Sequence, residues 1–248
     1  MRQSNAYIII FSTITTVLVG GLLATASQVL KPAQERSMEL DTKRQILGAV
    51  MQLKPGDDVL KIFDDRISSL IVNYKGEEIV RTSNTGDTIL AEDLNLGREF
   101  KAAPEERAFP VFIFHKEGSD EVEAYIFPVY GRGLWDNIWG YIALETDLKT
   151  IKGARFDHAG ETPGLGARIT EGEIQNRFIG KKMYDNAGQF VSVRMLKGER
   201  NPSDKLDEHH VDGLSGATLT TKGVNEMIQN YFGYYDAYIQ KLKNQTAS

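Results

Sequence analysis

Residues 109–130 read FPVFIFHKEGSDEVEAYIFPVY, and this segment is the clearest indication of the fold class of the chain. Two runs rich in aromatic and β-branched residues, 109–115 and 122–130, stand on either side of a short polar segment. The polar segment, 116–120, contains the Gly, Ser and Asp residues that are typical of turns. The pattern therefore predicts a β-hairpin.

Further strands are expected on both sides of this hairpin. Two short apolar runs flank Lys75-Gly76, and they predict a second hairpin. Other β-rich runs have the length and the bounding turn residues of strands; they are 138–145, 151–156 and 190–196.

Helical patterns occur before, between and after these strands. Residues 171–179 favour a helix, and segment 90–107, which has no strong period, is expected to be a loop or a short helix. From Thr220 to about Leu242 apolar residues recur at spacings of three and four, and we interpret this stripe as core. The expected fold class is α+β, with a twisted, mainly antiparallel sheet and flanking helices. Because strands and helices do not alternate and Gly-x-Gly-x-x-Gly is absent, a Rossmann nucleotide site is not supported.

The N-terminal segment 6–30 contains no charged residue and is long enough to cross a bilayer as a helix. The alternative is a cleaved signal peptide, because Ala24-Thr25-Ala26 fits the cleavage pattern; the apolar stretch is long for a signal, so we favour an uncleaved anchor. Pro32 is expected to open a second helix that leads out of the membrane and ends before Pro55. Basic residues lie on both flanks of the span, so the charges alone leave its orientation open.

The composition excludes several classes of function. The 248 residues include no cysteine, which rules out disulfides, cysteine-ligated iron–sulfur clusters and thiolate zinc sites. A net charge of -5 offers no basic surface for phosphate backbones, so no nucleic-acid partner is expected. His209 and His210 lie in an acidic stretch, but no third ligand stands at a convincing spacing, and we predict no metal site.

The residues best suited to chemistry lie immediately before the last predicted helix. Residues 212–221, DGLSGATLTT, are expected to form a loop of small and hydroxyl-bearing side chains that ends at a helix N-terminus. Free backbone amides and the positive end of the helix dipole favour a phosphate there, and Gly216 permits a close backbone approach. The alternative is a loop that only caps the helix.

This loop resembles a known motif. Asp212 followed by Ser215-Gly216-Ala217-Thr218 is similar to the flavinylation motif of the FMN-binding domain of bacterial redox pumps. Residues 160–166, GETPGLG, resemble the second signature of that family, and Gly133-Leu134-Trp135 with 140–145 resembles a third. Together with the N-terminal span, these motifs cover nearly the whole chain in family order. They most resemble the C subunits of the sodium-translocating NADH:quinone reductases, to which the G subunits of Rnf-type complexes are related.

The resemblance implies a covalent FMN, joined by a phosphoester to the hydroxyl of Thr218 and attached by a separate flavin transferase that uses FAD. Thr218 is the acceptor, and no residue is expected to be catalytic. Asp212 is interpreted as a residue for transferase recognition or metal-assisted activation, with a plain Asx-turn as the alternative. The other expected FMN-binding residues are Ser215, Gly216 and Ala217 at the phosphate, and Glu161, Thr162, Gly164, Leu165 and Trp135 near the ring. Trp135 either stacks on the ring or fills the core.

The function implied by the resemblance is electron transfer between cofactors of neighbouring subunits in a six-subunit membrane pump, which moves electrons from NADH to a quinone and sodium ions outward. The flavin domain of that family lies on the periplasmic side of the bacterial inner membrane. We therefore expect a transmembrane anchor at 1–30, a helical linker at 31–60 and an exported FMN-binding domain at 61–248. The alternatives are the equivalent subunit of an Rnf-type ferredoxin:NAD complex and a non-redox, membrane-tethered binding domain. A hydrolase ranks last, because no nucleophile elbow or paired base can be assigned.

Overall fold

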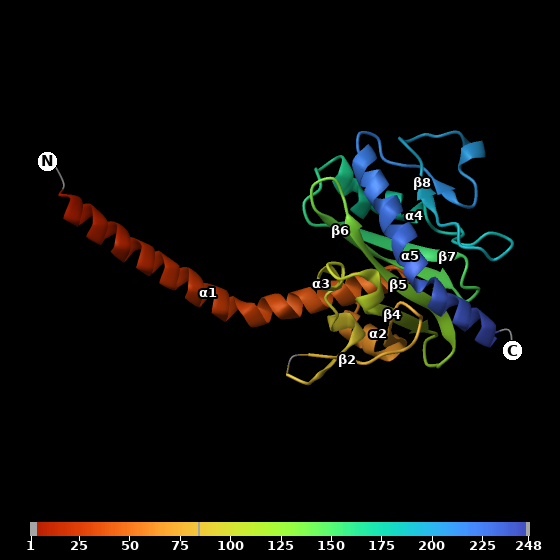
Figure 1. Cartoon of the computed structure of the whole chain (residues 1–248), viewed down its shortest axis with the longest axis horizontal. Coiled ribbons are helices and arrows are strands. Elements are labelled where there is room, and N and C mark those ends of the chain that lie inside the picture. Colours follow the sequence, from red (N-terminus) through yellow and green to blue (C-terminus); the bar gives the residue numbers. More distant parts are fainter. Residues whose placement is uncertain (1–3, 84, 247–248) are drawn as a thin grey trace. The chain divides into compact units, whose positions relative to one another are not determined.

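The computed structural model describes residues 4–83 and 85–246, and the chain forms two compact units that divide between Thr42 and Lys43. Helix α1 (Asn5–Gly48) begins in the first unit and ends in the second (Figure 1). Its large apolar side chains before the division are exposed, as is required of a helix that contacts lipid. Among the helices of the described residues, α1 alone is long and apolar enough to cross a membrane.

Helix α1 differs from the prediction at Pro32. We expected a new helix to open at this proline, but Pro32 lies inside one continuous helix. A proline inside a helix removes its own backbone donor and crowds the carbonyl four residues earlier, but the long segments on either side propagate the helix cooperatively. The helix also ends earlier than expected, at Gly48, where the amides of Ala49 and Val50 turn back to carbonyls of the last helical turn.

A five-stranded antiparallel sheet forms the centre of the second unit, with the strand order β1-β4-β5-β6-β7. The hairpin predicted from 109–130 is β4 and β5, and the next two predicted strands are β6 and β7. The strands are β1 (Ile67–Val72), β4 (Phe109–His115), β5 (Val122–Arg132), β6 (Asn137–Glu145) and β7 (Ile151–His158). The prediction of an α+β fold with a mainly antiparallel sheet is confirmed.

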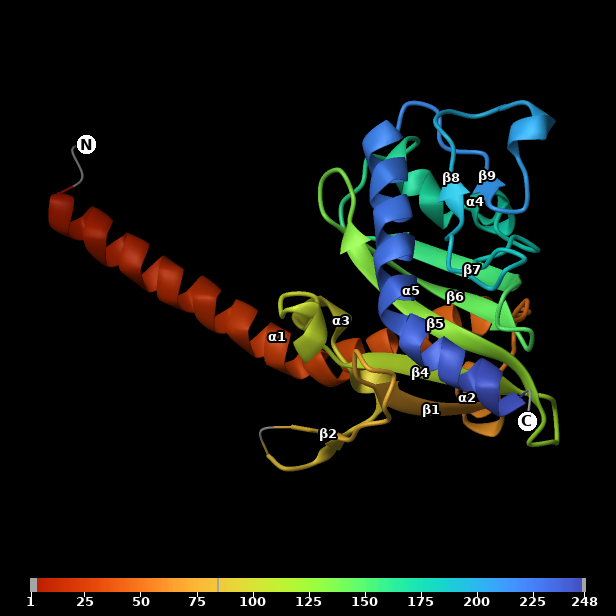
Figure 2. The ribbon, with the colours of Figure 1, turned by 45° about the vertical axis from the view of Figure 1, so that its right-hand side comes forward.

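Alternate side chains of the sheet supply two cores, one on each face. On β5, Phe127 and Val129 pack with α5 (Thr218–Thr246), which lies across the strands (Figure 2). Ile126 of the same strand belongs to the opposite cluster, with the end of α1 and with α2 (Val59–Arg66). The aromatic stripe of the last helix is therefore core, as predicted.

Short elements make up the connections. The predicted turn at Lys75-Gly76 is present, but the returning segment pairs with β1 only through a bridge at Glu78. Segment 90–107 holds short helices, as expected. The short connecting elements are the strands β2 (Arg81–Thr82) and β3 (Thr88–Ile89) and the helices η1 (Ala91–Asp93), α3 (Leu96–Glu99), η2 (Pro104–Glu106) and, later in the chain, η4 (Ser203–Lys205).

The strand expected at 190–196 is shorter than predicted. Only β8 (Arg194–Met195) forms, and it lies parallel to β9 (His210–Val211). Ser192 adopts a φ of 67°, which interrupts the extended backbone just before β8. The predicted strand therefore survives only at its end.

The helix expected at 171–179 is also shorter than predicted. It is α4 (Gly172–Asn176), and it follows directly on the tighter turn η3 (Gly166–Thr170). After Asn176 the amides of Arg177, Phe178 and Ile179 donate to carbonyls three residues earlier, so the segment continues as tight turns and not as an α-helix. The apolar pattern does not distinguish these turns from helix.

Candidate functional site

Three segments of the second unit meet at the start of α5. They are the turn between β5 and β6, the loop after β7, and the loop before α5 together with the first turn of that helix. Glu161 joins them: its Oε1 accepts a hydrogen bond from the backbone amide of Trp135 at 2.9 Å, and its Oε2 accepts one from the hydroxyl of Thr220 at 2.5 Å. Folding thus gathers the three sequence signatures in one place.

Thr218 is the first residue of α5, and it is exposed together with Ser215 and Gly216. The preceding Ala217 is buried, and its carbonyl accepts a hydrogen bond from the amide of Thr221 at 2.9 Å. Amides of the first helical turn have no partner within a helix and point toward its N-terminal end. An anion on Thr218 therefore meets free amides and the positive end of the dipole of a 29-residue helix.

Gly216 and Leu165 shape the approach to Thr218. Gly216 has a φ of 75°, a conformation that glycine adopts at little cost. A Cβ on Gly216 would lie 2.9 Å from Cδ2 of Leu165, so the two loops lie against each other here; this carbon is the end of an exposed side chain that can move aside. The positive φ is therefore the main reason for glycine at this position.

Asp212 anchors the N-terminal end of the loop before α5, residues 212–217, which we call the acceptor loop. Its carboxylate accepts hydrogen bonds from the backbone amides of Arg200 at 2.6 Å and Asn201 at 3.1 Å, and from the side chain of Asn201 at 2.7 Å. Burial opposes ionisation of Asp212, but these hydrogen bonds outweigh it and lower the pKa of the carboxyl. Such contacts favour a structural role for Asp212 over metal-assisted activation.

Glu199 holds the middle of the same loop. Arg168 donates two hydrogen bonds to its carboxylate, at 2.9 and 3.0 Å, and Arg177 donates a third at 3.1 Å. Oε2 of Glu199 also accepts a long hydrogen bond, 3.4 Å, from the backbone amide of Ser215. The hydrogen bonds from Arg168, assisted by those from Arg177 and Ser215, outweigh burial and lower the pKa of Glu199 to about 2.

Exposed apolar side chains stand on all three segments, namely Leu134, Trp135, Leu165 and Leu219. Trp135 is 71% exposed, so it does not fill the core. It is nevertheless fixed, because its backbone amide bonds to Glu161 and its indole N–H donates to Oγ1 of Thr162 at 3.1 Å. An ordered, exposed aromatic side chain of this kind suits a flat aromatic ligand.

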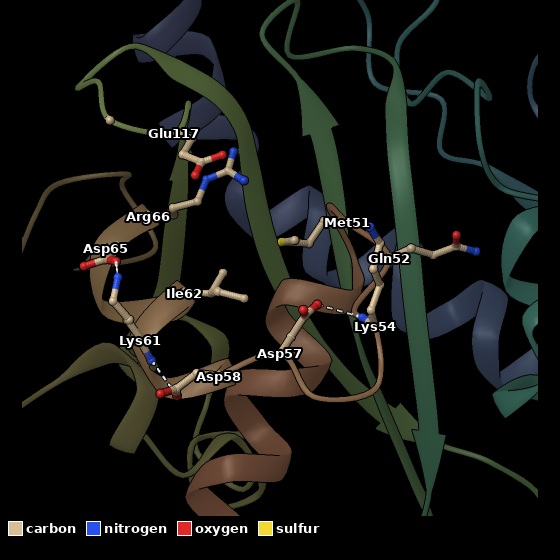
Figure 3. Close-up of a pocket in the computed structure, with 11 residues that line it drawn as sticks. Met51, Gln52, Lys54, Asp57, Asp58, Lys61, Ile62, Asp65, Arg66 and Glu117 are labelled. Atoms are coloured by element: carbon tan, nitrogen blue, oxygen red, sulfur yellow. Dashed lines mark hydrogen bonds and ion pairs between the residues drawn. The ribbon is translucent and has the colours of Figure 1, made fainter.

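A separate surface cavity of about 680 Å³ lies between the segment after α1, helix α2 and the β4–β5 turn (Figure 3). Several of its charged groups are engaged within the protein: Lys61 pairs with Asp65 at 2.6 Å, and Asp57 accepts a hydrogen bond from the amide of Lys54. The cavity shares no residue with the three converging segments. It is therefore a separate feature of the surface, and it contains none of the FMN-binding residues that the sequence predicts.

Comparisons with known proteins agree with this location. Residues 133–232 match the family model described as FMN-binding domain. The C subunit of the Na(+)-translocating NADH-quinone reductase of Pseudomonas aeruginosa is 30% identical to this chain, over 99% of each protein. The chain belongs to the family of C subunits of the Na(+)-translocating NADH-quinone reductases. A C subunit from Yersinia pestis is 33% identical, over 92% of this chain and 85% of the relative.

Solved structures of this family have the same fold. The crystal structure of the C subunit from Parabacteroides distasonis matches with a TM-score of 0.71 and 32% identity, covering 85% of this chain and 96% of that chain. The one from Shewanella oneidensis has a TM-score of 0.68 and 28% identity, covering 84% of this chain and 99% of that chain. The matched FMN-binding domain contains all three converging segments.

In this member of the C-subunit family, most predicted FMN-binding residues are exposed around the start of α5. These are Ser215, Gly216, Thr218, Thr162, Gly164, Leu165 and Trp135. Glu161 and Ala217 are buried, and Asp212 is half-buried. Glu161 was expected near the ring; its side chain points inward to Thr220, and its backbone amide donates to Nδ1 of His158.

Two residues of the site were not singled out from the sequence, Thr220 and Glu199. Thr220 stands two positions after Thr218 in the same motif, so its hydroxyl was a visible signal. Glu199 lies in a polar loop, 16 positions before Ser215, and no sequence pattern distinguishes it.

The described residues contain no cluster of three His, Cys, Asp or Glu side chains that would hold a metal ion.

Proposed function

We propose that this chain carries FMN as a phosphoester on Thr218 and relays electrons between cofactors of neighbouring subunits in a sodium-translocating NADH-quinone reductase. The observation that carries the proposal is the exposed hydroxyl of Thr218 at the N-terminus of α5, inside the matched FMN-binding domain. Bound FMN supplies the redox chemistry, and the protein supplies attachment, orientation and electrostatics. The chain has no substrate reaction of its own in this proposal.

The attachment is a group transfer from FAD, catalysed by a separate flavin transferase. The hydroxyl oxygen of Thr218 attacks the phosphorus nearer the flavin and forms the new P–O bond. The bond between that phosphorus and the bridging oxygen of the diphosphate breaks, and AMP leaves. The hydroxyl proton passes to a base of the transferase, and no electrons are transferred in this step.

The residues around Thr218 fit the two ends of FMN. Gly216 leaves the backbone accessible, and the first-turn amides of α5 suit the phosphate. Leu165 and Trp135 offer exposed apolar and aromatic surface to the isoalloxazine ring, with Thr162 and Gly164 as polar neighbours. The first-turn amides of α5, which have no partner within the helix, and the exposed Gly216 at positive φ support a phosphate at this position.

The proposal includes a membrane-bound setting. Residues 1–30 would anchor the chain in the bacterial inner membrane, 31–60 would act as a helical linker, and 61–248 would form the FMN-binding domain on the periplasmic side. The exposed apolar surface of α1 supports the anchor. The partners are the other subunits of a six-subunit pump and, during maturation, the flavin transferase.

Intact-mass analysis of the full chain, produced with a flavin transferase, tests the attachment. Trypsin releases residues 206–222 as one peptide, because no Lys or Arg lies between Leu206 and Lys222. An added FMN phosphoryl group on Thr218 within this peptide is the expected result. An unmodified peptide, with the transferase active on a control protein, would instead favour a membrane-tethered binding domain without flavin.

A further inference from the structure

Glu161 is a buried carboxylate at the centre of the site. Glu161 is 4% exposed, and its partner Thr220 is 1% exposed. Both carboxylate oxygens are used, one by the amide of Trp135 and the other by the hydroxyl of Thr220. Among the described residues Glu161 forms no ion pair, so these two neutral donors compensate for its burial.

Two glycines make room for this carboxylate. A Cβ on Gly133 would collide with Oε1 of Glu161, and a Cβ on Gly166 would collide with both Oε2 of Glu161 and Oγ1 of Thr220. The backbone of the β5–β6 turn and of the loop after β7 therefore closes around the Glu161–Thr220 pair. The amide of Glu161 itself donates to Nδ1 of His158 at 3.2 Å, which ties the loop to the end of β7.

The contact between Glu161 and Thr220 also bears on which side of the first turn of α5 is exposed. Thr218 and Thr220 are separated by about 200° around the helix axis, at about 100° per residue. When Thr220 points inward to Glu161, Thr218 is turned outward. A hydrogen bond at Thr220 thus fixes the rotation of the turn that presents the Thr218 hydroxyl.

We infer that Glu161 is a positioning residue for flavin attachment: through Thr220 it sets the first turn of α5 so that the Thr218 hydroxyl faces the incoming phosphorus. This inference rests on the proposed function, and it assigns the Glu161 side chain to orienting the acceptor and not to contacting the flavin. The hydrogen bond to a charged group is short, and removing its donor leaves a buried acceptor unsatisfied.

The test compares two neighbouring threonines. Thr220→Val removes the donor with little change of shape, and Thr220→Ser retains it. Thr221→Val is the matched control, because Thr221 is also buried but its Oγ1 has no hydrogen-bond partner among the described residues. Each full-length variant, in detergent, is incubated with purified flavin transferase and FAD, and covalent fluorescence is followed to its end point.

We expect Thr220→Val to reach the same end point as the wild type but about tenfold more slowly, the size of effect typical of a charged hydrogen bond. The loss should fall on kcat of the transferase more than on KM, and Thr220→Ser and Thr221→Val should react at nearly the wild-type rate. Glu161→Gln, which keeps the side-chain volume, should also slow labelling, and it tests the same contact if Thr220→Val is poorly folded.

Either of two results with labelled wild-type protein would overturn the inference. One is a wild-type rate in both Thr220→Val and Glu161→Gln. The other is a wild-type rate with a reduced end point, which indicates an unfolded fraction and no defect in orientation. A wild-type chain that is never labelled would instead overturn the proposed function itself, so the two failures are distinguishable.

Discussion

The carboxylate of Glu199 accepts a hydrogen bond from the backbone amide of Ser215 at 3.4 Å, and so joins two arginines to the acceptor loop. Arg168 and Arg177 form ion pairs with Glu199 at 2.9 and 3.1 Å. A charged cluster of Glu199, Arg168 and Arg177 therefore anchors the acceptor loop, while Ser215 and Gly216 stay exposed. This cluster gives the site a defined response to acid.

The stability of the protein should depend on ionised Glu199. Its pKa is lowered from 4.5 to about 2 in the folded state, so the folded protein binds this proton more weakly than the unfolded chain. The resulting stabilisation is complete above about pH 4.5 and is lost as pH falls toward 2. We expect the difference in free energy of unfolding between wild type and Glu199→Gln to shrink from pH 6 to pH 3, measured by urea denaturation.

Glu173→Gln is the control for this acid response. Glu173 pairs with the same Arg177 at 2.8 Å, but its side chain is 74% exposed, and exposed ion pairs contribute little. Its difference from wild type should be small at every pH. A Glu199→Gln difference that stays constant across the same range would contradict the prediction.

Gly216→Ala should disturb the site through two separate effects. A φ of 75° costs a non-glycine residue about 1–2 kcal/mol, and the new Cβ also meets Leu165. We expect lower thermal stability and slower FMN attachment. Gly188→Ala separates the effects, because Gly188 has a φ of 78° with no atom near its Cβ position. Equal losses of stability in the two variants would show that the Leu165 contact is unimportant.

Thr218→Ala should abolish covalent flavin without unfolding the protein. Thr218 is exposed and its side chain lies outside the core, so the free energy of unfolding should change by less than about 0.5 kcal/mol. In-gel flavin fluorescence after denaturation and circular dichroism measure the two properties. Thr218→Ser, which keeps a hydroxyl, should still accept FMN. Retained fluorescence in Thr218→Ala would refute the attachment site.

The orientation in the membrane is open to a cysteine-labelling test, because the natural chain has no cysteine. Glu117 is exposed in the β4–β5 turn, and Ser4 is exposed before α1. In spheroplasts, a membrane-impermeant maleimide should label Glu117→Cys and leave Ser4→Cys unlabelled until the membrane is disrupted. The reverse pattern would place the FMN-binding domain in the cytoplasm.

Regular elements with strong periods were predictable from the sequence, and their limits were less so. The four strands from β4 to β7 and the core face of α5 follow from alternation and from spacings of three and four. The length of the strand near 190–196 was overestimated because the apolar pattern does not reveal the positive φ of Ser192. Pro32 was interpreted as a helix start because proline is common at that position. Whether a helix continues through a proline depends on the long segments on both sides of it, and the residues around Pro32 alone do not show this.

Local sequence patterns were enough to predict the α+β class, the long apolar helix at the N-terminus and the loop before the helix that begins at Thr218. These properties depend on residues that are neighbours along the chain. The tertiary structure was needed to find that Glu161 bonds to Thr220 and that Glu199 holds Ser215, contacts that join residues 59 and 16 positions apart. Those pairs depend on how α5 packs across the sheet and on where the loops end, which no local pattern specifies.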